Sequence, residues 1–279
     1  YLEINLVKSI FIIKKIKPDI VFSTGGYVTL APALASYILS IPLFIHEQNS
    51  IPGLVNRILN RLSKLTFEAF PDSFNKSSKI HTVGNPVRSG IIKNPATEAK
   101  KKEHFNILIL GGSQGSKQLN EIVLKAFKDK IIPSYWRIVH QTGDLDKSSI
   151  VDIYSKQSFS YEVVSYIEDI GRAYHESDLV VGRSGAMTVS EICCSSKPSI
   201  LFPLPWAADN HQYFNAKFLE DKKASILLES SLDSADRLFT LLNDLEKDHN
   251  ARHSMSLNAF DAFPVSSGNR IVEIINESF

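Results

Sequence analysis

The chain has 279 residues, a length that corresponds to about two domains of ordinary size. Hydrophobic residues make up 43% and charged residues 22%, with a formal net charge of +1, which is typical of a folded globular protein and excludes nucleic-acid binding driven by bulk charge. The two cysteines, Cys193 and Cys194, are adjacent, so the sequence predicts no zinc site and favours a reducing compartment.

Short apolar strands alternate with amphipathic helices from Asp19 onwards. In the first part of the chain the pattern predicts strands over 19–23, 42–46, 65–69 and 79–83, with helices over 28–39 and 54–65. The uncharged stretch 20–45 is interrupted by Gly25-Gly26, Pro32 and Pro42, which favours strand, turn, helix and strand over a membrane span. The first residues carry no initiator Met and no signal-peptide pattern, and we interpret them as the interior of a longer chain.

The composition changes between residues 93 and 104, where Pro95 and the run Lys100-Lys101-Lys102 are typical of a linker. A second series of strands follows, over 105–110, 137–140, 161–164, 179–181, 199–202 and 224–228, most of them separated by helices. Repeated β-α-β units predict parallel sheets covered on both faces. We expect an α/β protein with two Rossmann-like doubly wound domains, an N-terminal domain over 1–92, a linker over 93–104, a C-terminal domain over 105–262, and a C-terminal helix over 263–279 that can pack back on the N-terminal domain.

Ligands of open parallel sheets bind beyond the carboxyl ends of the strands, so the segments that follow strands are informative. Gly111-Gly112-Ser113-Gln114-Gly115 lies between the strand 105–110 and a helix that starts near Lys117. Glycines and a helix N-terminus favour a phosphate site here, with a plain tight turn as the alternative. The segment matches neither a dinucleotide fingerprint nor a Walker A loop.

A second anion site is predicted at Gly182-Arg183-Ser184-Gly185, which follows the strand 179–181 and opens another helix. Glu191, one turn into that helix, is a candidate acceptor for ribose hydroxyls. The alternative is a capping box from Thr188 to Glu191.

Polar residues also end two N-terminal strands. His46-Glu47-Gln48-Asn49 suits acid–base work or the orientation of a substrate hydroxyl, and a loop whose side chains bond nearby backbone is the alternative. Gly25-Gly26-Tyr27 closes the preceding strand of the same layer, so both segments are expected to face one cleft.

Other polar positions have a binding interpretation and a structural one. Arg88 can bind a pyrophosphate bidentately or remain solvated, and Gln212 can bond sugar hydroxyls while Asp209 or Asn210 caps the helix. Asp144-Leu145-Asp146 resembles a metal–nucleotide aspartate pair, although we favour a solvated turn. An apolar and basic membrane face is one interpretation of Tyr37-Ile38-Leu39 with Lys14, Lys15, Lys17, Arg57, Arg61 and Lys64.

Six segments, taken together and in order, resemble the MurG family of bacterial glycosyltransferases, with a match from about residue 15 to the end. They are Gly25–Val28 (Gly-Gly-Tyr-Val), Ile41–Asn49 (Ile-Pro, then His-Glu-Gln-Asn), Val83–Arg88 (Val-Gly-Asn-Pro-Val-Arg), Gly111–Gly115 (Gly-Gly-Ser-Gln-Gly), Arg183–Glu191 (Arg-Ser-Gly-Ala-x-Thr-Val-Ser-Glu) and His211–Asn215 (His-Gln-Tyr-x-Asn).

The resemblance implies a GT-B fold, two Rossmann-like domains facing a cleft, with UDP-GlcNAc held by the C-terminal domain. It implies that Ser113 touches the pyrophosphate, Ile167 lies by the uracil, and Glu191 takes the ribose hydroxyls. It places Gln212 and Asn215 at the GlcNAc, Asn49 and Arg88 on the donor side, and, around the nucleotide and diphosphate, Ala186, Met187, Thr188, Val189 and Ser190. Further family-motif positions are Asn120 and, as catalytic candidates, Tyr27, His46 and Glu47.

The implied activity is an inverting transfer of GlcNAc from UDP-GlcNAc to undecaprenyl-diphosphate-muramoyl-pentapeptide, the step from lipid I to lipid II in peptidoglycan synthesis. Such an enzyme serves the cell wall, cell shape and cell division, and needs no cofactor or metal. Its expected partners are UDP-GlcNAc, lipid I, the membrane surface and other cell-wall synthesis proteins, with no nucleic acid. The expected location is the cytoplasmic face of the bacterial inner membrane, as a peripheral protein.

The chain departs from the family pattern at its start, where the family has a strand and a Gly-Gly-Thr-Gly-Gly-His loop that supplies the main general-base candidate. The expectation is an incomplete N-terminal domain that binds donor but transfers sugar poorly, which a version with the segment restored would test. Two alternatives remain open at this point: a non-catalytic UDP-sugar-binding subunit of a split GT-B enzyme, and a UDP-GlcNAc epimerase.

Overall fold

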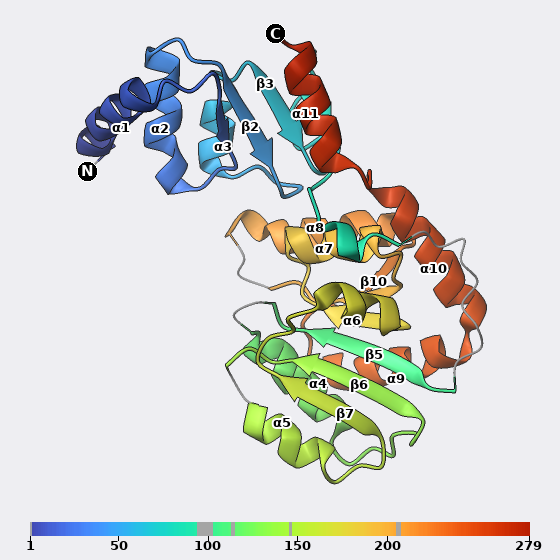
Figure 1. Ribbon diagram of the computed structural model, residues 1–279. Coiled ribbons are helices and arrows are strands. Elements are labelled where there is room, and N and C mark those ends of the chain that lie inside the picture. Colours follow the sequence, from blue (N-terminus) through green and yellow to red (C-terminus); the bar gives the residue numbers. More distant parts are fainter. Residues whose placement is uncertain (1, 94–102, 113–114, 145–146, 205–207) are drawn as a thin grey trace. The chain divides into compact units, whose positions relative to one another are not determined.

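The computed structural model describes all residues except 1, 94–102, 113–114, 145–146 and 205–207. The chain divides into two compact units (Figure 1). The N-terminal unit combines Tyr1–Pro86 with Ser266–Phe279, and the C-terminal unit is Val87–Val265. Each unit contains one parallel sheet.

The N-terminal unit has a sheet of order β1-β2-β3-β4, in which every pairing is parallel. Its strands are β1 (Val21–Ser23), β2 (Leu43–Glu47), β3 (Leu65–Glu68) and β4 (Ile80–Thr82). Its helices are α1 (Leu2–Ile16), α2 (Tyr27–Ile38), α3 (Leu54–Leu59) and, from the end of the chain, α11 (Ser267–Glu277).

Strand β2 is buried along its whole length because helices cover both faces of this sheet. Leu43 and Ile45 point to one face, where they pack against Ala33 of α2 and against Val55 and Leu59 of α3. Phe44 points to the other face and packs against Phe67, Val83, Ile271 and Ile274. Helix α11 therefore completes the core of a unit whose other elements lie at the start of the chain, as Figure 1 shows.

The C-terminal unit has a six-stranded parallel sheet of order β10-β9-β8-β5-β6-β7. The strands are β5 (Phe105–Leu110), β6 (Trp136–Gln141), β7 (Ser160–Val164), β8 (Leu179–Gly182), β9 (Ser199–Leu201) and β10 (Ser225–Leu227). The helices are α4 (Lys117–Phe127), α5 (Lys147–Tyr154), α6 (Ile170–Glu176), α7 (Ala186–Cys194), α8 (His211–Asp221), α9 (Ser234–Lys247) and α10 (His249–Ala262), with short 3-10 turns η1 (Ser89–Ile91) and η2 (Ala208–Asn210).

The chain winds outward from β5 in both directions. It passes through β6 and β7 to one edge of the sheet, and then returns to place β8 on the other side of β5. The strand order therefore reverses between β5 and β8, and the crevice at such a reversal is the usual ligand site of doubly wound sheets.

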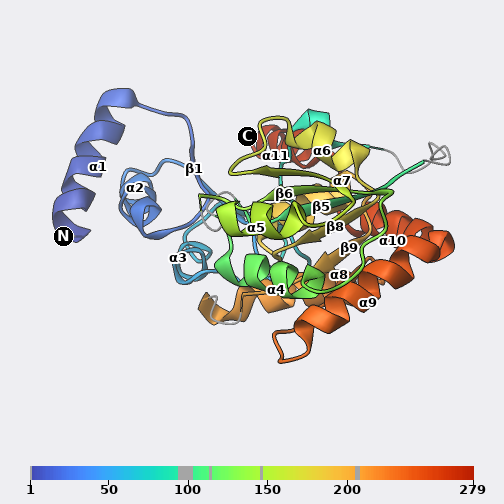
Figure 2. The same cartoon turned by 90° about the horizontal axis from the view of Figure 1, so that it is seen from below.

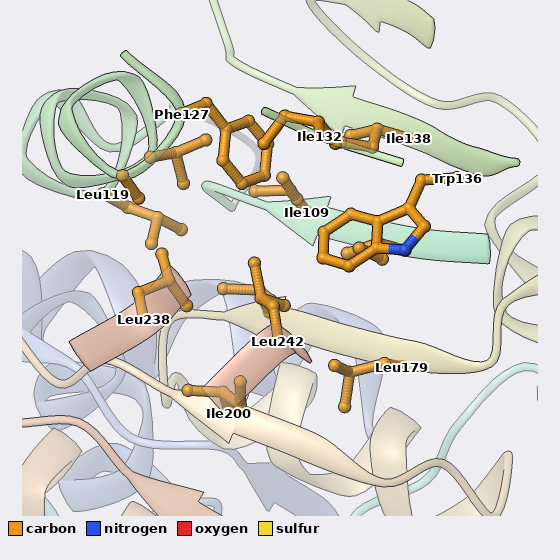
Figure 3. Close-up of a cluster of buried hydrophobic side chains, with 14 of the residues drawn as sticks. Ile109, Leu119, Phe127, Ile132, Trp136, Ile138, Leu179, Ile200, Leu238 and Leu242 are labelled. Atoms are coloured by element: carbon orange, nitrogen blue, oxygen red, sulfur yellow. The ribbon is translucent and has the colours of Figure 1, made fainter. Parts of the chain in front are cut away.

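The main core of the C-terminal unit lies between the sheet and helices α4 and α9 (Figure 3). Ile109 of β5 and Trp136 of β6 face Leu119 of α4, and Leu238 and Leu242 of α9. Figure 2 shows α6 and α7 on the opposite side of the strands. Because helices cover both faces of the sheet, most of its strands contain runs of apolar residues. These apolar runs are what predicted the strands from the sequence.

The predicted strands are confirmed, with bounds that differ by no more than two residues; β5 has the predicted bounds. The sequence pattern predicts no element before Asp19, where the structure has α1. Helix α3 ends at Leu59 rather than at Leu65, because the side chain of Asn60 accepts a hydrogen bond from the Thr66 hydroxyl (2.8 Å) and fixes a turn there. No helix among the described residues is long and apolar enough to cross a membrane.

Candidate functional site

Two glycine-containing segments follow β5 and β8, the strands between which the order reverses. The strands are paired in register up to Leu110 and Gly182, and the N–H of Arg183 donates to the carbonyl of Leu110 (3.4 Å). The segments that start at Gly111 and at Arg183 thus leave the sheet side by side. Both predicted anion sites therefore lie at the position where this sheet topology binds ligands.

The loop after β5 is held against the end of β6. The N–H of Gly111 donates to the carbonyl of Gln141 (3.1 Å). Gly115 has φ of +78°, and a Cβ placed on it would lie 2.2 Å from the carbonyl oxygen of Thr142, so the position accepts glycine alone without rearrangement. Helix α4 begins at Lys117, with the Ser116 side chain as its cap, so its positive end lies directly after the loop. Ser113 lies outside the described residues.

Gln141, the last residue of β6, connects this loop to a second predicted nucleotide contact. Its Nε2 donates to the carbonyl of Gly112 (2.9 Å), and its Oε1 accepts from the N–H of Ile167 (3.1 Å). Ile167 is the residue predicted to lie by the uracil. One buried side chain therefore bonds both segments.

Asn120 supports the same loop from within the unit. Its Nδ2 donates to the carbonyl of Thr142 (3.3 Å), and its Oδ1 accepts from Nε2 of His140 (3.2 Å). Nδ1 of His140 then accepts from the hydroxyl of Tyr154 (3.0 Å), which leaves a neutral imidazole. Burial lowers the pKa of His140 to about 3. The side chain of Asn120 is fully buried, and its hydrogen bonds are made to Thr142 and His140 of the same unit.

Glu191 lies in α7, with its carboxylate partly exposed at the same end of the sheet. Its Oε2 accepts a hydrogen bond from the hydroxyl of Tyr174 (3.1 Å). Burial raises the pKa of Glu191, and the Tyr174 hydrogen bond and the charge of Arg88 lower it in part. The alternative of a capping box is wrong, because α7 begins at Ala186 with Gly185 as its cap, which places Thr188 inside the helix.

The residues predicted to surround the nucleotide occupy the first turns of α7. Met187 is 43% exposed, whereas Val189 and Ser190 are buried, and Ser190 donates to the carbonyl of Ala186 (2.8 Å). The described side chains at Ala186, Met187 and Thr188 are accordingly those closest to solvent.

The two predicted GlcNAc contacts are tied to the loop after β8. Oε1 of Gln212 accepts from the N–H of Leu204 (3.0 Å) and from Nε of Arg183 (3.4 Å). The Ser184 hydroxyl donates to the carbonyl of Gln212 (2.7 Å), and Nδ2 of Asn215 donates to the carbonyl of Ser184 (3.1 Å). Helix α8 is preceded by Asn210, whose side chain makes no capping hydrogen bond.

His46, in the N-terminal unit, has a hydrogen bond at each ring nitrogen. Nε2 donates to the carbonyl of Gly84 (3.0 Å), and Nδ1 accepts from Nε2 of Gln48 (3.1 Å), which makes the ring neutral. Burial lowers its pKa, opposed by the Gly84 hydrogen bond and by the charge of Glu47. The ring thus joins the end of β2 to the segment that follows β4.

Glu47 organises the loop that follows β2. Its Oε1 accepts from the N–H of Asn49 (3.0 Å), and its Oε2 accepts from the N–H of Gly53 (3.1 Å) and from Nδ2 of Asn56 (2.9 Å). Glu68, its register partner on β3, does the same for the next loop by accepting from the N–H groups of Asp72 and Phe74. Both carboxylates are 3% exposed.

Tyr27 begins α2 and is 82% exposed, so its ring faces solvent. The adjacent Gly25 has φ of +85°, and a Cβ there would lie 2.8 Å from Nδ2 of Asn56. Asn56 therefore links three predicted motif residues, because its Nδ2 also donates to the carbonyl of His46 (3.1 Å) and to Glu47.

The motifs did not reveal Gln141, Tyr174 or Asn56, although each bonds a predicted site residue. The signal in the sequence was weak: a glutamine directly after an apolar strand, and a polar residue inside each of two short helices. In the described part of the chain no group of three or more His, Cys, Asp and Glu side chains is placed to hold a metal ion. Leu145 and Asp146 lie outside the described residues.

Comparison with known proteins agrees with this architecture. The glycosyltransferase family 28 C-terminal domain matches residues 106–271, and the N-terminal domain of the same family matches residues 2–67. A UDP-N-acetylglucosamine--N-acetylmuramyl-(pentapeptide) pyrophosphoryl-undecaprenol N-acetylglucosamine transferase of Coxiella burnetii is 40% identical over 92% of this chain and 74% of its own length. The enzyme of the same name from Vesicomyosocius okutanii is 38% identical over 99% of this chain and 75% of its own length.

Solved structures give the same result. The crystal structure of Acinetobacter baumannii MurG superposes with a TM-score of 0.83, at 32% identity, over 98% of this chain and 77% of that one. UDP-GlcNAc 2-epimerase from Neisseria meningitidis has a TM-score of 0.69 over 99% of this chain and 82% of that one, but its 16% identity shows the fold alone. The chain has a GT-B fold and belongs to the MurG family, within glycosyltransferase family 28.

Proposed function

We propose that this chain transfers GlcNAc from UDP-GlcNAc to the muramyl-pentapeptide that is linked through diphosphate to undecaprenol, the lipid I acceptor of peptidoglycan synthesis. Membership of the MurG family at 38 to 40% identity supports the reaction. The main structural support for the proposal is the position of the two glycine-containing segments that start at Gly111 and Arg183. They flank the point where the strand order of the C-terminal sheet reverses.

The C-terminal unit is the proposed donor site. The N-termini of α4 and α7, with the loop that contains Gly112, receive the diphosphate of UDP-GlcNAc, because backbone N–H groups and the helix dipole favour an anion there. Glu191 accepts the ribose hydroxyls, and Ile167 lies by the uracil. Gln212 and Asn215 bind the GlcNAc of the donor.

The reaction is a direct displacement. A hydroxyl oxygen of the acceptor forms a bond to C1 of GlcNAc, the bond from C1 to the diphosphate oxygen breaks with its electron pair leaving on UDP, and the hydroxyl proton passes to a base. Attack from the side opposite the leaving group inverts the configuration at C1. Helix N-termini stabilise the charge that develops on UDP.

The N-terminal unit is the proposed acceptor side. Tyr27, His46, Glu47 and Asn49 remain the candidates for contact with the reacting groups. His46 bonds the carbonyl of Gly84 and Glu47 accepts from the N–H of Asn49, so both side chains connect segments of the same unit. We propose that these two residues act at least by holding Asn49 in place.

We also propose that the N-terminal unit binds the surface of an anionic membrane. Tyr37 and Ile38 at the end of α2 are 56% and 57% exposed and form the apolar part of the proposed surface, the α2 end. Lys14, Lys15 and Lys17, which are exposed at and just after the end of α1, supply its cations. Lys64 is engaged elsewhere, since it donates to the carbonyl of Ser278 (2.6 Å) and lies over the Phe279 ring.

The first test is calorimetric titration of the chain with UDP-GlcNAc, UDP-glucose and UDP-GalNAc, beside Glu191→Ala. We expect selective binding of UDP-GlcNAc, weakened about 10- to 100-fold in the variant, because hydrogen bonds to a charged group are lost. A matched control is Glu162→Ala, an exposed glutamate on the edge strand β7.

A transfer assay with lipid I then decides the reaction. Glycosylated acceptor and free UDP are expected together. Donor binding without any glycosylated acceptor, both in this chain and in the version with the N-terminal segment restored, would indicate a binding subunit. UDP with an altered sugar in the absence of acceptor would indicate an epimerase. A folded chain that binds no uridine nucleotide would refute the proposal.

Co-sedimentation with vesicles tests the membrane surface. We expect Ile38→Ser to reduce binding to vesicles rich in phosphatidylglycerol about tenfold, because one apolar side chain is lost from the bilayer interface. The control is Ile131→Ser, which removes a 94% exposed side chain from the C-terminal unit. Equal binding by both variants would exclude the α2 end as the membrane surface.

A further inference from the structure

We infer that Gln141 is a positioning residue that couples diphosphate binding to uracil binding in the donor site. The inference rests on the proposed function, because the two segments that Gln141 joins are donor contacts only if the chain binds a uridine diphosphate sugar.

Gln141 occupies the end of β6 next to β5, the strand that leads into the glycine loop. It is 5% exposed, so its amide has left water and depends on hydrogen bonds within the chain. Both ends of that amide are satisfied: Nε2 by the carbonyl of Gly112 at 2.9 Å, and Oε1 by the N–H of Ile167 at 3.1 Å. The backbone carbonyl of Gln141 also accepts from the N–H of Gly111 (3.1 Å).

These bonds constrain the glycine loop at Gly112, where the backbone has the most conformational freedom. Gly112 has φ of +85° and open space around its Cα, so packing alone does not fix its peptide planes. The bond from Gln141 therefore fixes the direction in which the Gly112 carbonyl points.

The bond to Ile167 constrains the second segment in the same way. Residues between β7 and α6 form a short connection in which the N–H of Ile167 would otherwise need a water partner. Only a side chain that both donates and accepts can satisfy a carbonyl and an N–H at once, which glutamine does at this reach. The relative position of the two segments is thus set by one amide.

Two variants separate the two bonds. Gln141→Met has a similar length and loses both hydrogen bonds. Gln141→Glu keeps an acceptor for the N–H of Ile167 but loses the donor to the Gly112 carbonyl. The matched control is Gln157→Met, because the side chain of Gln157 also makes two hydrogen bonds to the backbone, donating to the carbonyls of Phe127 and Lys130. Gln157 lies before β7, at the opposite end of the strands.

The readout is the dissociation constant for UDP-GlcNAc, UDP and uridine, with thermal unfolding of each variant. Gln141→Met is expected to weaken UDP and UDP-GlcNAc about tenfold, from two net hydrogen bonds. Gln141→Glu is expected to weaken UDP at least as much, with uridine affinity within about twofold of the unmodified chain. In turnover, KM for the donor rises and kcat changes less than about twofold, because both bonds exist before the chemical step.

The outcomes are distinguishable. If the unmodified chain binds UDP-GlcNAc and Gln141→Met binds it equally well, Gln141 does not position the donor, and the proposed function stands. The same conclusion follows if Gln157→Met weakens UDP as much as Gln141→Met does. If the folded, unmodified chain binds none of the three ligands, the proposed function and this inference fall together.

Discussion

The hydroxyl of Tyr174 donates a 3.1 Å hydrogen bond to the carboxylate of Glu191, and the tyrosine ring is completely buried. The carboxylate of Glu191 is therefore fixed by a hydrogen bond from a side chain that is itself immobilised by burial. Because that hydrogen bond opposes the rise that burial causes in the pKa of Glu191, it also keeps the group ionised over a wider pH range.

Removing this hydroxyl should change both the strength and the pH dependence of donor binding. In Tyr174→Phe we expect affinity for UDP-GlcNAc to fall about fivefold at neutral pH, from one lost hydrogen bond. The pKa of Glu191 should rise further, so the loss of affinity on acidification should begin at higher pH than in the unmodified chain. Calorimetry across the acid range measures both effects.

Tyr135→Phe is the control for that variant, because Tyr135 also bonds a glutamate, Glu246, but precedes β6 at the opposite end of the sheet. Its donor affinity should not change. An unaltered pH profile in Tyr174→Phe would show that Tyr174 does not set the ionisation of Glu191.

Gly115 should tolerate no side chain. A Cβ there would approach the Thr142 carbonyl to 2.2 Å, so Gly115→Ala should lower the free energy of unfolding by about 3 kcal/mol and abolish tight donor binding. Gly112→Ala shares the positive φ but meets no atom within 4 Å, and should cost only about 1 kcal/mol. Denaturant unfolding compares the two. Equal losses of unfolding free energy in the two variants would show that the contact with the Thr142 carbonyl does not determine the cost at Gly115.

Glu47 and Glu68 lie opposite each other on β2 and β3. Substituting each in turn distinguishes a role in loop structure from a role in catalysis. Each accepts N–H groups of its own loop, so Glu47→Gln and Glu68→Gln should each destabilise the unit by about 2 kcal/mol. Only the Glu47 loop carries Asn49, and we expect Glu47→Gln alone to reduce kcat, by about 10- to 100-fold. Steady-state assays below the unfolding temperature test this. A comparable loss of kcat in Glu68→Gln would assign both carboxylates a purely structural role.

His140 should make the C-terminal unit sensitive to acid. Its pKa is 6.5 when unfolded and about 3 when folded, so between these values the unfolded chain alone binds a proton. The stabilisation is complete above pH 6.5 and is lost as pH falls towards 3, at about 1.4 kcal/mol per pH unit. Denaturant unfolding at several pH values should show a shallower slope for His140→Gln than for the exposed control His253→Gln. Parallel slopes would contradict the assignment.

The sequence predicted the elements that follow simple periodicity. The strand Phe105–Leu110 is apolar at nearly every position and is bounded by a histidine and two glycines, so its limits were clear. The glycine-containing segments after β5 and β8 were predicted as anion sites because they follow buried strands, and the structure has them side by side at the ends of those strands. Six motifs in order then indicated the family.

What the sequence could not predict depends on contacts between distant residues. Tyr174 and Glu191 are separated by seventeen positions, and Gln141 reaches Gly112 across twenty-nine, so neither pair leaves a local pattern. The capping-box interpretation failed because Thr188 and Glu191 have the right spacing whether or not the helix begins at Thr188. The sequence left two interpretations of His46 open, an acid–base group and a loop residue bonded to nearby groups, and only the structure shows Gly84 and Gln48 at its ring nitrogens.

The placement of α11 bears on how the chain matures during synthesis. Ile271 and Ile274 fill the face of the N-terminal sheet on which Phe44 and Phe67 lie, yet they are translated after the whole C-terminal unit. A nascent chain can therefore close the contiguous C-terminal unit while the earlier-made sheet still shows an apolar face to chaperones. The N-terminal unit therefore cannot complete its core until residues 266–279 have been synthesised.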